Sequence, residues 1–386
     1  MTSKERVKKA VLFQCPDRIP FHLPEPWGSD FLWVNADPDL LFKPKIHPIR
    51  SPATDSMAGS SDVTSGLTSN GVQTDIKWED EWGSVWEKLS SDKTMGQVKF
   101  YPLSSYENIK EYRFPDYKNP SRYLSARDAI AKNKDEKFVL AGTPLSFIHR
   151  LEYLRGHESA WTDSYLYPKE FEKLLDKLAD IAIDAIDNFS KIGVDPVRSR
   201  KCLSDISVTE VPSALPTSNG VDGIISADDW GLQDRLMVSP DIWRKFWKPR
   251  YKKVYHYAHE KGLLTFLHSC GYITDIIADL IEAELDVLQL DQQENMGVEK
   301  LSKLFGGKIC FWCPVDIQNT MVKGSIEDVK NYAKKLIDSF GRFNGGFMAK
   351  TYPSPEAIEH SKEKTDAMCE TFVNYGSARR SFSVGG

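Results

Sequence analysis

The stretch from Leu263 to Leu290 decides the fold, because it reads as a strand, a helix and a second strand. Its first part, Leu263-Leu-Thr-Phe-Leu-His268, is a short apolar run. A helical pattern follows from Tyr272 to Ala283, and the apolar run Asp286-Val-Leu-Gln-Leu290 comes directly after it. Short apolar strands that alternate with amphipathic helices are typical of a parallel sheet. The stretch therefore predicts an α/β protein.

The same alternation continues on both sides of this stretch. Apolar residues at steps of three and four predict a long helix from Pro168 to Ile192. Further strands are predicted at 18–23, 137–142, 193–195, 223–228, 308–312 and 345–349. Together with the two strands above, they bring the count to eight. Eight such units predict a single-domain (β/α)₈ TIM barrel over residues 1–386, with an open doubly wound sheet as the alternative.

Local signals place several helix boundaries. Ser239 followed by Pro240 has the cap residue and first-turn proline that begin a helix. Pro249 lies inside the same pattern and should kink or split that helix. Ser325-Ile-Glu-Asp328 predicts a capping box for a helix that ends near Phe340.

Two regions break the rhythm of strands and helices. Residues 28–100 contain Ser-, Thr- and Gly-rich segments and are predicted to be an irregular N-terminal extension, either a cap or an oligomer contact. A polar stretch with proline and serine, residues 196–222, is predicted to be a loop insertion.

Composition limits the class of protein and its partners. The net charge is −5 and both signs are interspersed without a basic block, so no nucleic-acid partner is expected. The charged N-terminus does not resemble a signal peptide, and no apolar run is long enough to span a bilayer. We therefore expect a cytoplasmic protein without a membrane partner. The six cysteines are too few for a disulfide framework in this chain, and clustered thiols point to metal binding or catalysis.

The strand that ends in His268-Ser-Cys270-Gly271 is the strongest candidate site, because barrels carry their chemistry at the C-terminal ends of the strands. His268 and Cys270 face the same side of a strand but are about 7 Å apart when it is extended. Two ligands of one zinc ion must approach to roughly 3 to 4 Å. The two side chains must therefore converge, or the chain must curl at Cys270, which Gly271 permits.

A third thiolate from Cys310 or Cys313 would complete a zinc site with one open position. In a regular strand these two residues face opposite sides, so only one of them should point inward. The alternative is that His268 is a packed or substrate-binding residue and that the thiols are inert and buried.

Other candidates follow neighbouring strands and turns. Adjacent carboxylates Asp228 and Asp229 can bind substrate, orient a metal or act as acid and base, although Asp229 could instead cap the next turn. His149 is a candidate proton donor, and Tyr352 could orient the substrate or supply a proton. Several tryptophans could line an aromatic pocket. They are Trp27, Trp33, Trp78, Trp82, Trp86 and Trp230.

At these residues the sequence resembles the uroporphyrinogen decarboxylase-like superfamily, and the resemblance spans nearly the whole chain. Four segments carry it by their order and spacing. They are Lys4 to Pro20, Asp229-Trp-Gly231 with the helix after it, His268-Ser-Cys-Gly271 with Asp286-Val-Leu288, and Phe305 to Asp316. The resemblance implies a (β/α)₈ barrel, in agreement with the count of strands.

Features of this sequence distinguish between two branches of the superfamily. Its tetrapyrrole decarboxylases carry an arginine-rich segment after the first strand, whereas Pro24 to Asp30 has no arginine here. The other branch comprises zinc-dependent methyltransferases that exchange methyl groups with a corrinoid protein, and its His-x-Cys matches His268 and Cys270. Its third ligand is a cysteine after the last strand, where this chain has Lys350-Thr-Tyr352.

The resemblance therefore implies a methyltransferase that uses Zn²⁺ to move a methyl group from a small donor to cobalamin on a separate corrinoid protein. The tryptophan-rich N-terminal region of this chain favours an aromatic methyl ether as the methyl donor, and thus O-demethylation. A homodimer, in which a second copy of the chain is the partner, is a further possibility. One alternative is a metal-free decarboxylase of a small aromatic or tetrapyrrole-like acid that uses Asp229 and His268. Another is a non-catalytic barrel that serves as a binding subunit.

Overall fold

Eight parallel strands curl into a nearly closed barrel at the centre of the computed structural model, which describes residues 1–40, 42–43, 45–48, 75–90, 96–192, 220–353 and 355–378. The order around the sheet is β1-β12-β11-β10-β9-β8-β7-β2, and a backbone bridge between His22 and Ser29 links its two ends. This arrangement confirms the predicted (β/α)₈ barrel. The strands are β1 (Phe21–His22), β2 (Phe31–Asn35), β7 (Phe138–Gly142), β8 (Gly223–Ala227), β9 (Leu264–His268), β10 (Val287–Gln289), β11 (Cys310–Cys313) and β12 (Phe347–Lys350).

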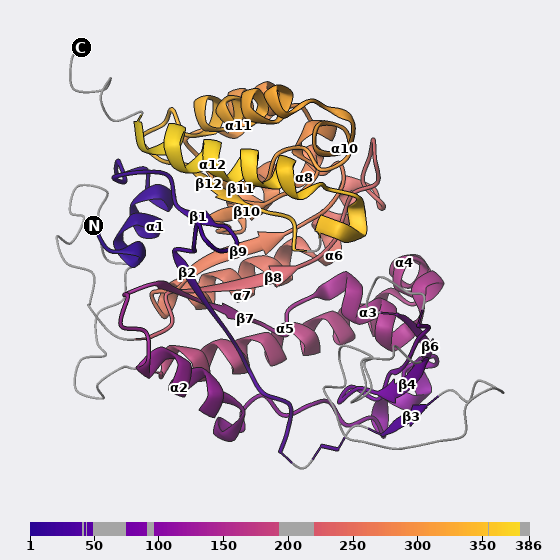
Figure 1. The fold of residues 1–386 in the computed structure, drawn as a ribbon. Helices are drawn as coiled ribbons and strands as arrows, with labels where there is room; N and C mark the ends of the chain where they lie inside the picture. Colours follow the sequence, from indigo (N-terminus) through magenta and orange to yellow (C-terminus); the bar gives the residue numbers. More distant parts are fainter. Residues whose placement is uncertain are drawn as a thin grey trace.

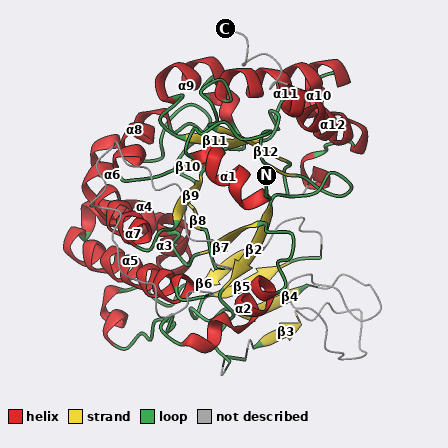
Figure 2. Cartoon of the chain, turned by 90° about the vertical axis from the view of Figure 1, so that its left-hand side faces the viewer, coloured by secondary structure: helices red, strands yellow, loops and turns green. Residues whose placement is uncertain are grey.

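Helices surround the strands (Figures 1 and 2). They are α1 (Ser3–Val11), α2 (Leu124–Ala131), α3 (Phe147–Arg155), α4 (His157–Leu166), α5 (Pro168–Ser190), α6 (Pro240–Phe246), α7 (Lys248–Glu260), α8 (Thr274–Glu282), α9 (Val298–Phe305), α10 (Thr320–Lys323), α11 (Ile326–Phe340) and α12 (Lys362–Ala378). None of the helices in the described part of the chain has the length and apolar composition that a membrane span requires.

The predicted helix boundaries hold where the sequence carries explicit signals. Ser239 caps α6 by accepting a hydrogen bond from the Ile242 amide. The helical pattern is split before Pro249, which lies in the first turn of α7, where its missing N–H costs no hydrogen bond. The reciprocal hydrogen bonds of a capping box join Ser325 and Asp328 at the start of α11.

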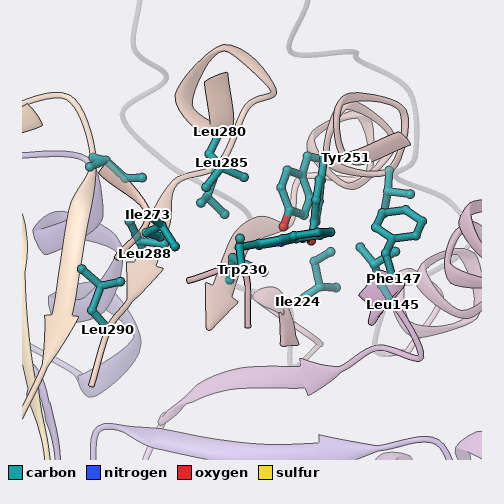
Figure 3. Close-up of a cluster of buried hydrophobic side chains, with 14 of the residues drawn as sticks. Leu145, Phe147, Ile224, Trp230, Tyr251, Ile273, Leu280, Leu285, Leu288 and Leu290 are labelled. Carbon is teal, nitrogen blue, oxygen red and sulfur yellow. Dashed lines mark hydrogen bonds between the residues drawn. The ribbon is translucent and has the colours of Figure 1, made fainter. Parts of the chain in front are cut away.

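Apolar side chains fill both the inside and the outside of the barrel. Alternate residues of the strands form the interior cluster, and α1 adds to it from the N-terminal end. The members of this cluster are Val7, Ala10, Val11, Phe31, Phe138, Leu140, Ile225, Phe266, Val287, Cys310, Trp312 and Met348. A larger cluster lies between the strands and the helices, where Trp230 and Tyr251 pack together (Figure 3). The packed interior leaves the C-terminal ends of the strands as the place for a site.

The described residues of the region 28–100 contain more regular structure than the sequence predicts. β2 joins the barrel, and an antiparallel sheet forms from β3 (Ile46–Pro48), β4 (Ile76–Glu79), β5 (Val85–Lys88) and β6 (Gln97–Phe100). These strands are short, so sequence alternation alone does not reveal them, but Trp78 and Trp86 stack across the β4–β5 pair. Trp86 also packs edge-on against Tyr153, so this sheet lies on α3.

Two predictions lie wholly or mostly outside the described residues. The predicted strand at 193–195 is one, and the eighth place in the barrel is taken by β2. The predicted insertion 196–222 is the other, because only residues 220–222 of it are described.

Candidate metal centre

Two loops cross at the C-terminal mouth of the barrel and bring three candidate ligands together. The loop after β8 carries Asp229, and the loop after β9 carries Cys270, whose amide donates to Asp229 Oδ1 at 2.8 Å. The Gly231 amide donates to the Cys270 carbonyl at 3.1 Å. Gly271 has φ +78°, and a Cβ there would lie 2.0 Å from the Gly231 carbonyl oxygen. The curl expected at Gly271 is therefore present, and only glycine fits it.

Asp229, His268 and Cys270 form a cluster whose ligand atoms all lie within 4.8 Å of one another. His268 Nε2 is 3.4 Å from Cys270 Sγ and 3.4 Å from Asp229 Oδ1. These separations match the roughly 3 to 4 Å between ligands of one tetrahedral zinc ion. An imidazole nitrogen, a sulfur and a carboxylate oxygen are all donors that zinc accepts, so the three side chains fit a zinc ion with one position left open.

The charges of the cluster suit a cation. Burial by itself would raise the pKa of Asp229, but hydrogen bonds and charge from His268, the charge of His149 and the Cys270 amide lower it to about 2. Burial and the carboxylates of Asp229 and Asp291 raise the pKa of the Cys270 thiol. A cation bound at the cluster would reverse that shift, because coordination favours the thiolate.

His149 lies beside the cluster at the first turn of α3. Its Nε2 is 3.6 Å from Asp229 Oδ2, and its Nδ1 is 3.4 Å from Glu152 Oε2. Burial lowers the pKa of His149, but Glu152, Asp228 and Asp229 together raise it above its ordinary value. The structure therefore brings the predicted proton donor next to Asp229, one of the three residues of the cluster.

Asp228 is fully buried and points away from the cluster, into the core. Its carboxylate accepts hydrogen bonds from the amides of Phe147 at 2.9 Å and Ile148 at 2.8 Å, and from the Tyr251 hydroxyl. These hydrogen bonds fix the N-terminus of α3 and thereby the position of His149, which is the next residue in the helix. The predicted acid or base role of Asp228 stays a prediction, and its burial does not favour it.

Neither Cys310 nor Cys313 reaches the cluster. Among the described residues, Asp229, His268 and Cys270 are the only His, Cys, Asp or Glu side chains of which three or more bring ligand atoms within 4.8 Å of one another. Cys310 is level with Val287 in the strand register and belongs to the interior apolar cluster, one layer below His268. Cys313 faces the helices, as the alternation of a regular strand requires. The expectation of a third thiolate therefore needs correction, and a carboxylate, Asp229, lies in that place.

Three polar residues at the mouth were not singled out from the sequence. Gln289 Oε1 is 2.6 Å from His268 Nδ1, and Gln289 Nε2 donates to Asp291 Oδ1 at 2.8 Å. Lys350 Nζ donates to the same Asp291 oxygen at 2.8 Å, in a buried ion pair. All three lie at or just after strand ends, which is the signal that marks them in the sequence. Their partners, however, come from different strands and appear only in the fold.

A cavity of about 340 Å³ adjoins the cluster through Gln289. Its walls include the rings of Trp33 and Trp312, whose centroids are 6.0 Å apart. The complete lining is His22, Trp33, Gln289, Trp312, Lys350, Thr351 and Pro353. The predicted Tyr352 is part of the same segment, and its pKa is raised by burial and by the charges of Asp291, Cys270 and Asp229.

A comparison with protein families supports the resemblance seen in the sequence for the second half of the barrel. The family model described as uroporphyrinogen decarboxylase (URO-D) matches residues 217–351, which include Asp229, His268 and Cys270. No curated protein matches the chain.

Solved structures also share features with the chain at low similarity. A methyltransferase from Methanosarcina mazei has 16% identity and a TM-score of 0.49, with 73% of each chain covered. A D-psicose 3-epimerase has 10% identity and a TM-score of 0.35, covering 69% of this chain and 85% of its own. A GH18 chitinase from Flavobacterium johnsoniae has 7% identity and a TM-score of 0.34, covering 68% and 82%. The family match rests on sequence instead, so the resemblance to the uroporphyrinogen decarboxylase family is confirmed for residues 217–351, the part of the chain that holds the three candidate ligands.

Proposed function

We propose that the chain is a zinc-dependent methyltransferase that moves a methyl group from a small donor to the cobalamin of a separate corrinoid protein. The observation that carries the proposal is the cluster of Asp229, His268 and Cys270, whose ligand atoms lie within 4.8 Å of one another at the mouth of the barrel. All three residues lie in the part of the chain, residues 217–351, that matches the URO-D family model. Three protein ligands and one open position are typical of catalytic rather than structural zinc.

The bound ion would act as a Lewis acid on the donor and stabilise the leaving thiolate, alkoxide or phenolate. Asp229, His268 and Cys270 would hold it. His149 lies behind Asp229, where it can hold or deliver a proton to the leaving group. Tyr352 follows β12 at the same mouth and is the second candidate for that task.

The cavity beside the cluster supports an aromatic methyl ether as the donor. Trp33 and Trp312 present two indole rings to it, and aromatic surfaces favour offset contact with another ring. Gln289 belongs both to the cavity lining and to the hydrogen bonds of His268, so a donor in the cavity would lie next to the ligands.

Metal analysis of purified protein tests the centre. We expect near-stoichiometric zinc in the wild type and its loss in Cys270→Ala. Cys310→Ala is the matched control, because Cys310 is a buried cysteine of the same barrel outside the cluster, and it should retain the metal. Absence of bound metal in the wild type, or equal retention in Cys270→Ala, would overturn the proposal.

The reaction is tested by methyl transfer to cob(I)alamin from a panel of aromatic and aliphatic methyl ethers and methyl thiols. Formation of methylcobalamin that depends on Cys270 supports the methyltransferase. Release of carbon dioxide from a small aromatic acid without cobalamin would support the decarboxylase instead. A binding subunit would catalyse neither reaction.

A further inference from the structure

A continuous path of side-chain contacts runs from the ion pair at β12 to the imidazole of His268. Lys350 Nζ donates to Asp291 Oδ1 at 2.8 Å, and Gln289 Nε2 donates to the same oxygen at 2.8 Å. Gln289 Oε1 then lies 2.6 Å from His268 Nδ1. Lys350, Asp291 and Gln289 are buried, so these contacts are shielded from competing water.

The direction of each hydrogen bond along this path follows from chemistry. An ionised carboxylate only accepts, and the ammonium of Lys350, which forms a buried ion pair with Asp291, only donates. The Gln289 amide must therefore present its NH₂ group to Asp291. Its carbonyl oxygen consequently faces His268, where it can only accept. The Nδ1 of His268 must then carry the hydrogen.

The other ring nitrogen of His268 is thereby left as a lone pair. That nitrogen, Nε2, is the atom 3.4 Å from Cys270 Sγ and 3.4 Å from Asp229 Oδ1. A neutral imidazole carries one hydrogen, so placing it on Nδ1 leaves Nε2 free to bind a cation.

We infer that Gln289 is a positioning residue, which Asp291 and Lys350 orient and which holds His268 in the Nδ1–H tautomer with Nε2 aimed at the ligand cluster. The inference rests on the proposed zinc site for its purpose, but the tautomer itself is a property of the metal-free protein. The inference also assigns Lys350, which ends β12 and lines the cavity, to orienting His268 rather than to direct metal binding.

The tautomer is measured directly by ¹⁵N NMR of the histidine side chains in metal-free protein, at an alkaline pH where the imidazole is neutral. The His268 signal is assigned with His268→Gln. We expect the Nδ1–H pattern in the wild type, and a loss of that preference in Gln289→Leu, which has no acceptor. Gln289→Glu keeps an acceptor and should keep the tautomer.

Gln233→Leu is the matched control, because it makes the same replacement at an exposed glutamine and should leave the His268 signal unchanged. If Gln289→Leu does not fold, Gln289→Asn asks the same question, since its shorter side chain withdraws the acceptor from Nδ1. An Nε2–H tautomer in the wild type would overturn the inference. So would an unaltered tautomer in Gln289→Leu, or in Gln289→Asn if Gln289→Leu does not fold.

Zinc affinity provides a second readout by competition with a chromophoric chelator. Removing a partner that orients a metal-bound histidine typically weakens metal binding 10- to 100-fold, so we expect a loss of about that size in Gln289→Leu and none in Gln233→Leu. Equal zinc affinity in the two variants would contradict the positioning role. A wild type that shows the Nδ1–H tautomer but binds no zinc would instead overturn the proposed function and leave the tautomer assignment standing.

Discussion

The crossing of the loops after β8 and β9 offers the most direct test of how the site is built. Gly271→Ala introduces a methyl group at φ +78°, a conformation that costs an L-residue roughly 1 to 2 kcal/mol. Its Cβ would also lie 2.0 Å from the Gly231 carbonyl oxygen and 2.6 Å from that of Leu232. Both neighbours are backbone atoms, so the loops must separate, at a further cost of about 1 to 3 kcal/mol.

Separation should also break the hydrogen bond from the Gly231 amide to the Cys270 carbonyl, which contributes about 1 kcal/mol. We therefore expect the free energy of unfolding to fall by about 3 kcal/mol or more. Cys270 should move away from Asp229, so bound metal should be lost as well. Urea denaturation followed by fluorescence measures the first effect, and metal analysis of the folded variant measures the second.

Gly262→Ala separates backbone strain from loop crossing. Gly262 has φ +75°, but a Cβ there would meet nothing within 4 Å. It should therefore lose only the roughly 1 to 2 kcal/mol of conformational strain and retain metal. If the two variants are equally stable and both bind metal, the reasoning about the crossing is refuted.

Three further predictions concern polar side chains, of which Asp228 and Lys350 are buried and His259 is partly exposed. Asp228→Asn should lower the free energy of unfolding by about 1 to 3 kcal/mol, because it weakens the buried charged acceptor that binds the amides at the N-terminus of α3. The variant should retain its zinc. Loss of metal without loss of stability would contradict this prediction. Lys350→Met leaves Asp291 as an uncompensated buried charge and should destabilise the fold by about 3 to 5 kcal/mol in urea, whereas an unchanged midpoint would show that the ion pair contributes nothing. Burial lowers the pKa of His259, but the carboxylates of Asp286 and Glu284 raise it above its ordinary value. Its stabilising contribution is thus complete below the unfolded pKa of about 6.5 and is lost as pH rises through the folded pKa. The Tm of the wild type should accordingly fall more steeply above about pH 6.5 than that of His259→Gln, and parallel pH profiles would exclude the effect.

The barrel could be predicted because its signals are local. Each strand and the helix after it occupy a few dozen consecutive residues, and the stretch from Leu263 to Leu290 already contains one complete unit. The strands β2 to β6 were not predicted, because they are short and show little periodicity of their own. In β4 and β5 the order depends instead on a cross-strand pair, Trp78 with Trp86.

By itself, the sequence determined that Asp229, His268 and Cys270 lie at or just after the ends of strands in a parallel sheet, and that glycine permits a curl beside Cys270. It did not determine which side chain joins the His-x-Cys pair, because Cys310 and Cys313 have a more suitable donor atom than a carboxylate. Only the tertiary structure decided this. Strand register places Cys310 one layer too low, regular alternation turns Cys313 toward the helices, and the crossing of two loops at Gly231 and Gly271 carries Asp229 to the cluster.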